Sequence, residues 1–167
     1  MAQKQTKNVS YEGFTLTLAL VDALPVLFFG GSSIILGLLF QSPLFLVGAC
    51  LIFLGGFGKV LWKLILAAKK QDVVLLNRQM KYTMSVGFLC VILSVILGRK
   101  RLNGAAILAG LTSLPSLIFF ILGLCGMVTM GVLAKKLDSS VAKNNWIEQC
   151  VNGCAQLCIF LGLLFLL

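Results

Sequence analysis

Residues 14–40 read FTLTLALVDALPVLFFGGSSIILGLLF, an apolar run in which Asp22 is the single charged side chain. A transmembrane helix needs about 20 consecutive, mainly apolar residues to cross a hydrocarbon core about 30 Å thick. Only helices and closed barrels satisfy their backbone hydrogen bonds in lipid, and a run of this length is typical of a helix. The run therefore predicts a membrane-spanning helix.

The composition extends this interpretation to the whole chain of 167 residues. Hydrophobic residues make up 59% and charged residues 11%, whereas soluble domains have about 45–50% apolar and about 25% charged residues. The mean hydropathy is +1.04. At about 20 residues per span, the chain has room for about five helices and no separate aqueous domain. The sequence predicts an all-α integral membrane protein, a bundle of about five transmembrane helices.

Run lengths and flanking charges define the other spans. They cover residues 44–68, 82–98, 104–134 and 146–167, which together with 14–40 form a single transmembrane domain, 14–167, after a cytoplasmic segment, 1–13. The run 104–134 is longer than a span needs, so tilt, a kink at Pro115 or an interfacial first part must accommodate it. Pro25 is a second candidate for a helix break.

Positive charges predict the orientation, because Lys and Arg concentrate in short cytoplasmic loops. The outer face would carry only Arg99, Lys100 and Arg101 if the N-terminus is cytoplasmic. The inner face would then carry Lys4, Lys7, Lys69, Lys70, Arg78, Lys81, Lys135, Lys136 and Lys143. We therefore expect a multi-pass protein of the bacterial plasma membrane, with its N-terminus in the cytoplasm and its C-terminus outside.

The net charge of +9 does not indicate a nucleic-acid partner, because the basic residues flank the predicted spans. Anionic lipid attracts each Lys or Arg near the membrane surface by about 1 kcal/mol. The expected partners are therefore the bilayer and its anionic headgroups. The candidate headgroup contacts are Lys69, Lys70, Arg99, Lys100, Arg101, Lys135 and Lys136.

The residue types argue against catalysis. The chain has no His, which excludes His-ligated haem or zinc and nucleophiles activated by His. Of its five acids, only Asp22 lies deep within a run, so two carboxylates cannot face each other at the same depth. There is no Gly-rich phosphate-binding loop. We expect a non-enzymatic protein without a metal or a cofactor.

Three cysteines, Cys150, Cys154 and Cys158, recur every four residues in the last run and would stack on one face of a helix. Thiolates bind Cu(I) or zinc, but no C-x-x-C motif and no His accompanies them. We predict that they are small residues on a packing face.

Asp22 needs a partner, because an isolated Asp at the centre of a membrane helix costs about 2.5–3.5 kcal/mol. At 1.5 Å per residue, Asp22 lies about 12 Å from the start of its run, and Lys59 about 13 Å from the end of the next run. This similar depth predicts that Asp22 lies within salt-bridge reach of Lys59 or Lys63, with Lys59 as the preferred partner. Lys63, one turn nearer the inner face, is also within reach but is expected to extend toward the headgroups beside Trp62.

The last span has a polar face formed by Glu148, Gln149, Asn152 and Gln156, which fall within about 100° on a helix. Lipid does not accept such a face, so it must turn toward other helices or a cavity. In the first case the chain is an accessory or structural subunit, or a scaffold, that assembles with itself or with other membrane subunits. In the second it is a small carrier or channel, proton-coupled if Asp22 titrates. The sequence favours the first function, with the second as the alternative.

Overall fold

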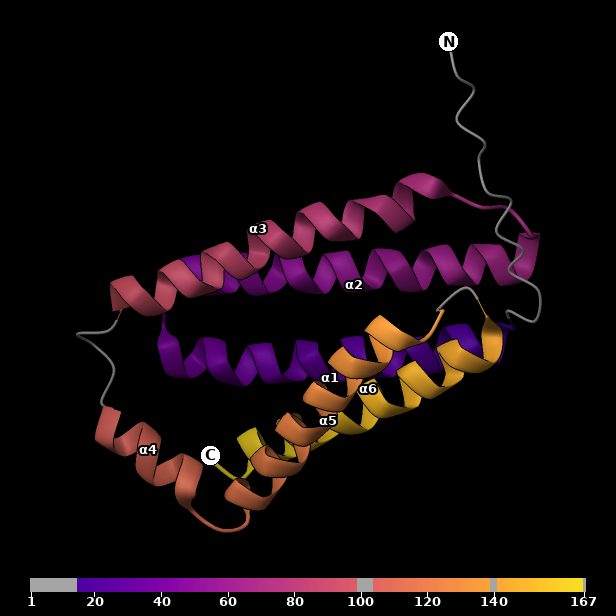
Figure 1. Ribbon diagram of the computed structural model, residues 1–167. Helices are drawn as coiled ribbons and strands as arrows, with labels where there is room; N and C mark the ends of the chain where they lie inside the picture. The colour runs from indigo at the N-terminus through magenta and orange to yellow at the C-terminus, as the bar shows by residue number, and fades with distance from the viewer. Residues whose placement is uncertain (1–14, 99–103, 139–140, 167) are drawn as a thin grey trace.

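The computed structural model describes residues 15–98, 104–138 and 141–166, and these ranges are helical without any β-strand (Figure 1). The helices are α1 (Leu16–Phe40), α2 (Pro43–Lys69), α3 (Val74–Gly98), α4 (Gly104–Thr112), α5 (Ser116–Lys136) and α6 (Ala142–Leu164). All except α4 are long and apolar enough to cross a membrane. The prediction of an all-α chain with five spans is confirmed at this level. The predicted segment 1–13 and the cluster Arg99, Lys100 and Arg101 lie outside the described residues.

A tight turn joins α1 to α2. Gln41 ends α1 in the left-handed conformation, with φ of 45°, and its N–H donates to the carbonyl oxygen of Gly37. Ser42 then caps α2, because its Oγ accepts a hydrogen bond from the N–H of Phe45 at 3.4 Å. Pro43 follows in the first turn of α2, where a missing N–H costs nothing. The turn therefore places α2 antiparallel to α1.

The third and fourth spans differ from the prediction. α3 begins at Val74 rather than at residue 82, because polar and basic residues such as Arg78 continue the helix beyond its apolar part. The run 104–134 is not one helix: α4 ends at Thr112, α5 begins at Ser116, and a cis peptide bond joins Leu114 to Pro115 between them. Proline lacks an N–H and restricts the residue before it, so a break at this position is physically reasonable.

The prediction of a helix break at Pro25 is wrong, since α1 continues through this residue. Pro25 is buried and faces α6, where a Cβ added to Gly153 would lie 3.9 Å from its Cδ. Membrane helices tolerate an internal proline where neighbouring helices cover the interrupted backbone.

The helices form two hairpins that α1 connects. α2 packs on α3 and α5 packs on α6, while α1 contacts both α2 and α6 (Figure 1). No extensive contact joins α3 to α5 in the described part of the chain. The order across the bundle is therefore α3, α2, α1, α6, α5, an open row in which α1 is the connecting helix.

Glycines bring the helices of each hairpin close together. A Cβ added to Gly48 of α2 would lie 2.7 Å from the carbonyl oxygen of Gly87 of α3, and the reciprocal distance is also 2.7 Å. In the other hairpin, Gly123 and Gly126 of α5 both pack against Ala155 of α6. Small residues are common between membrane helices because they allow the backbones to approach.

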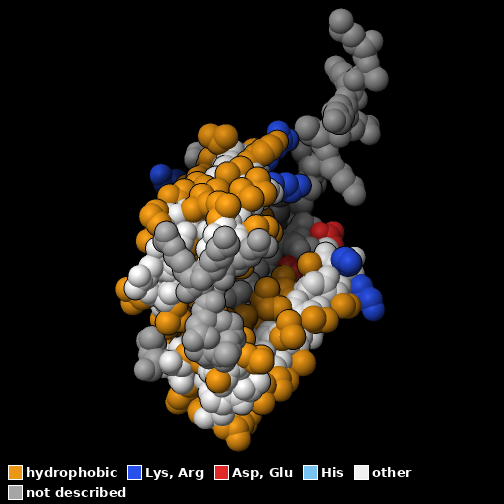
Figure 2. Space-filling model, turned by 90° about the vertical axis from the view of Figure 1, so that its left-hand side faces the viewer, with side chains coloured by type: hydrophobic (Ala, Val, Ile, Leu, Met, Phe, Trp, Pro, Cys, Tyr) orange, Lys and Arg blue, Asp and Glu red, His pale blue; other side chains and the backbone are white. Residues whose placement is uncertain are grey.

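The outer surface is apolar along the helices and basic at one end. Figure 2 shows hydrophobic side chains over most of the visible face, with Lys and Arg near its margin. Leu38 and Leu97, for example, are 67% and 74% exposed. Lys69, Lys70, Lys135 and Lys136 are exposed at the C-terminal ends of α2 and α5, which lie at the same end of the bundle as the N-termini of α1 and α6.

The predicted orientation can be measured by cysteine accessibility. In a background without native cysteines, Gln71→Cys is expected to react only with a thiol reagent applied from the cytoplasm, and Gln41→Cys only with one applied from outside. Both positions are exposed and lie at opposite ends of α2, so each serves as the control for the other. Labelling of both from one side would contradict the spanning of α2, and the reverse pattern would invert the predicted orientation.

Candidate functional site

A buried ion pair joins α1 to α2. The Nζ atom of Lys63 lies 2.8 Å from Oδ1 of Asp22. Only 1% of Lys63 and 4% of Asp22 are exposed. Lys63 also donates a hydrogen bond of 2.9 Å to Oδ1 of Asn145 on α6. Three helices therefore meet at one ammonium group.

Asp22 thus pairs with Lys63, one of the two lysines that the sequence placed within its reach. The preference for Lys59 and the expected extension of Lys63 toward the headgroups are wrong. Counted from the observed helix ends at Leu16 and Lys69, Asp22 and Lys63 each lie about 9 Å inside the bundle. The predicted depths of the side chains were measured from the borders of the apolar runs, which are not the helix ends. The resulting error in relative depth is about one helical turn. Lys59 is half-buried and close enough to act electrostatically on Lys63.

α6 adds further polar side chains to this region. Asn145, Glu148 and Gln149 are 2%, 3% and 4% exposed, and Glu148 interacts electrostatically with Lys63. Glu148 lies about 9 Å from the start of α6, the depth of the ion pair. The buried polar cluster is thus formed by Asp22, Lys63, Asn145, Glu148 and Gln149.

Apolar and aromatic residues surround Trp62, the neighbour of Lys63. Trp62 packs with Leu18 and Leu66, with Trp146 of α6 against them. Its Nε1–H donates a 2.7 Å hydrogen bond to Oδ1 of Asp72, just beyond the end of α2. A packed aromatic layer therefore lies at the basic end of the bundle, next to the buried polar cluster.

Sequence reasoning missed Asn145 and the contact between Trp62 and Asp72. Asn145 precedes the predicted last span, 146–167, by one residue, whereas α6 begins at Ala142. Its spacing to Glu148 and Asn152 continues the polar face at helical intervals, and this signal would have extended the span.

A central cavity of about 440 Å³ lies between the two hairpins. All five long helices line it, and its polar side chains are Ser32 and Ser33 of α1 and Asn152 and Gln156 of α6. The Nε2 atom of Gln156 donates a 3.5 Å hydrogen bond to the sulfur of Met127. The polar face of α6 is therefore divided, with two residues in the buried polar cluster and two at the cavity.

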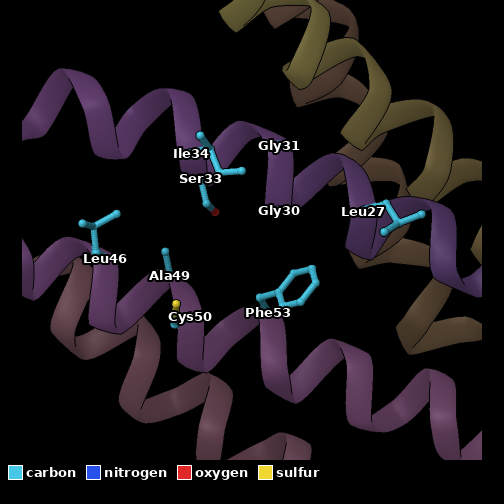
Figure 3. Close-up of a pocket in the computed structure, with 9 residues that line it drawn as sticks. All are labelled: Leu27, Gly30, Gly31, Ser33, Ile34, Leu46, Ala49, Cys50 and Phe53. Carbon is cyan, nitrogen blue, oxygen red and sulfur yellow. The ribbon is translucent and has the colours of Figure 1, made fainter.

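A second hollow of about 380 Å³ lies between α1 and α2 (Figure 3). We name it the lateral groove. Leu27 and Ile34 line it and are 58% and 65% exposed, so it is open to the surroundings of the bundle. Phe53 and Ala49 of α2 line both this groove and the central cavity. The two hollows are thus adjacent and share lining residues.

The described residues contain no cluster of three or more His, Cys, Asp or Glu side chains that could hold a metal. The six cysteines are free. Cys150 and Cys154 are exposed and Cys158 is half-buried, so the predicted packing face is not formed against other helices of this chain. α6 turns its polar face inward, which leaves the cysteines on the opposite side, facing outward.

No family model, curated protein or solved structure matches this chain. The function is therefore inferred from the buried polar cluster and the central cavity.

Proposed function

We propose that this chain is a non-catalytic structural protein, an accessory subunit or scaffold of a complex in the bacterial plasma membrane. The observation that carries the proposal is the buried contact in which Lys63 binds both the carboxylate of Asp22 and the amide oxygen of Asn145. In a proton-coupled carrier, an acid must exchange protons with water during the cycle. Here the only acid within α1 is buried against a cation, which favours a role in joining helices.

The pairing also explains why the charges are tolerated in a membrane. Taking two charged groups out of water costs several kcal/mol per ion, and a buried pair repays this only with good geometry and additional hydrogen bonds. The amide oxygen of Asn145 supplies such a bond to Lys63. The contact therefore favours one arrangement of α1, α2 and α6 over others.

The outer helices support assembly with further subunits. Among the described residues of α3 only Gly87 and Ser94 are buried, and among those of α5 only Ser116 and Gly123. Two membrane helices thus expose most of their surface. Lipid, a second copy of the chain or another membrane subunit would contact these faces.

The central cavity favours a carrier or channel as the second candidate function. It brings Asn152 and Gln156 to a space that all five long helices line. Asp22 does not line this space, so a path through the cavity would use the amides without the acid.

Proteoliposomes that contain a pH-sensitive dye test the proton-coupled form of the carrier against the structural function. Under an imposed pH gradient and membrane potential, the purified protein is expected to carry no more protons than protein-free liposomes, because Asp22 is paired and away from the cavity. Gramicidin-treated liposomes give the positive control. A proton flux that the folded Asp22→Asn variant loses would replace the structural proposal by the carrier.

The subunit role has its own readout. Gentle extraction from native membranes, followed by quantitative mass spectrometry, is expected to give a fixed ratio of this chain to a partner or to further copies. A strictly monomeric protein in native lipid discs would contradict the subunit proposal.

A further inference from the structure

The central cavity has a lining that the structural proposal does not use. No charged side chain among the described residues lines it, and most of its walls are apolar or aromatic, including Phe29, Ile52 and Val91. Its volume of about 440 Å³ falls within the range of about 300–1,000 Å³ that is usual for small-molecule sites. Such a lining excludes an ionised solute, because an unpaired charge would lose its hydration without compensation.

The cavity is elongated along the helices. Its lining residues on α1 extend from Pro25 to Leu36, a distance of about 16 Å at 1.5 Å per residue. On α6 they extend from Asn152 to Ile159. A narrow apolar space that runs parallel to the helices has the shape of a hydrocarbon chain.

Polar groups occur at intervals along this apolar space. Asn152 lies about 15 Å from the start of α6, near the middle of a hydrocarbon core about 30 Å thick. Gln156 follows one turn later, and the contact of Gly31 with Phe160 places Ser32 about one further turn along. The headgroup of a phospholipid stays at the interface, so these groups are positioned for a polar group inside the membrane.

Ser32 supplies independent support for a ligand. Ser32 is one of the residues that line the cavity, it is 4% exposed, and its buried Oγ has no hydrogen-bond partner in the described structure. A buried polar atom without a partner costs about 1–3 kcal/mol. The thioether sulfur that accepts from Gln156 is only a weak acceptor. Both positions would gain from a ligand oxygen.

The bilayer has direct access to this space. α3 and α5, the outer helices of the two hairpins, make no extensive contact with each other in the described part of the chain. On the side of α1 and α2, the lateral groove shares Ser33, Ala49 and Phe53 with the cavity (Figure 3). A membrane-dissolved molecule can therefore approach without passing through water.

We propose that the central cavity binds a single neutral long-chain lipid that carries a hydroxyl or carbonyl group. The hydrocarbon chain would lie against the apolar walls, and the oxygen would form hydrogen bonds with the amide of Asn152 and the neighbouring polar groups of Gln156 and Ser32. This site is separate from the buried polar cluster. The inference therefore does not depend on the proposed structural function.

Photolabelling in phosphatidylcholine nanodiscs tests the site. The probes are a long-chain alcohol with a diazirine on its chain, the matched hydrocarbon without the hydroxyl, and a phosphatidylcholine that carries the same chain. The alcohol is expected to label peptides of α1, α2 and α6 saturably and about fivefold more than the hydrocarbon, which is the factor that one hydrogen bond provides. Equal, non-saturable labelling by all three probes would overturn the proposal, as would saturation by the phosphatidylcholine alone.

Two kinds of variant test the hydrogen bond from Asn152 and the volume of the central cavity separately. Asn152→Leu is expected to remove the preference for the alcohol while hydrocarbon labelling remains. Val91→Trp fills the cavity from α3 and should abolish labelling by both probes. Val95→Trp, one turn further along α3 and not in the lining, is the matched control and should label like the wild type.

Thermal unfolding and gel filtration establish that each variant folds, and Met127→Trp replaces Val91→Trp if the latter does not. A folded Asn152→Leu variant with the wild-type ratio of alcohol to hydrocarbon labelling would overturn the proposed recognition.

Discussion

Replacing Asp22 by Leu alone is expected to lower the free energy of unfolding by about 3–5 kcal/mol, because Lys63 would remain buried as an uncompensated charge. The Lys63 side chain is 1% exposed, and Asn145 can offset only part of the loss with its amide oxygen. Lys63→Met should have an effect of similar size, since it leaves the carboxylate of Asp22 buried without its cation. Reversible unfolding in mixed micelles, followed by the fluorescence of Trp62 and Trp146, measures both changes.

The double variant Asp22→Leu with Lys63→Met removes both charges, so it separates the cost of one unpaired buried charge from the contribution of the ion pair itself. It is expected to be close to the wild type in stability, because apolar replacement of a complete buried pair is often neutral or favourable by about 1–4 kcal/mol. Lys59→Met is the matched control and should change the stability by less than about 1 kcal/mol, since Lys59 is half-buried and outside the ion pair. Single variants as stable as this control would contradict the role of the pair.

Gly87→Ala is expected to lower the free energy of unfolding by about 1–3 kcal/mol through overpacking between α2 and α3. The added Cβ would lie 2.7 Å from the carbonyl oxygen of Gly48 and 2.7 Å from Cγ1 of Ile52. A backbone oxygen cannot rotate away as a side chain can, so the two helices must separate. The same unfolding assay gives the change in stability.

Gly48→Ala should have a similar effect, and the double variant should lose less than the sum of the two, because both methyl groups separate the same two backbones. Gly131→Ala is the control, since a Cβ there would meet nothing within 4 Å. It should be neutral or stabilising by up to about 1 kcal/mol, the difference in helix propensity. Equal losses at residues 87 and 131 would contradict the close contact.

The five membrane helices could be predicted because apolar run length directly reports the thickness of the bilayer. Their ends could not, because the ends depend on capping and on polar residues that continue a helix into the interface. α3 therefore begins at Val74 rather than at residue 82. The break before Ser116 was foreseen only as a kink, whereas Pro25 is accommodated by its contact with α6.

The site was partly accessible to the same reasoning. Asp22 and the amides of the last span could be selected because lipid excludes unpaired polar groups. The choice of Lys63 over Lys59 required the observed helix ends and the direction of the lysine side chain, which run borders do not give. The cavity could not be predicted at all, because it depends on the open order of helices that α1 establishes between the two hairpins.

The connecting position of α1 has a consequence for how the protein is made. Translation produces Asp22 before Lys63, and the third member, Asn145, follows Lys63 by 82 residues. α1 alone would enter the lipid with an uncompensated acid, so the short turn after Phe40 makes α1 and α2 a natural unit of insertion. α6 leaves the ribosome after the other described helices, and the hydrogen bond to Lys63 forms only with its arrival. The contact of α1, α2 and α6 at Lys63 is therefore completed only after α6 has been made.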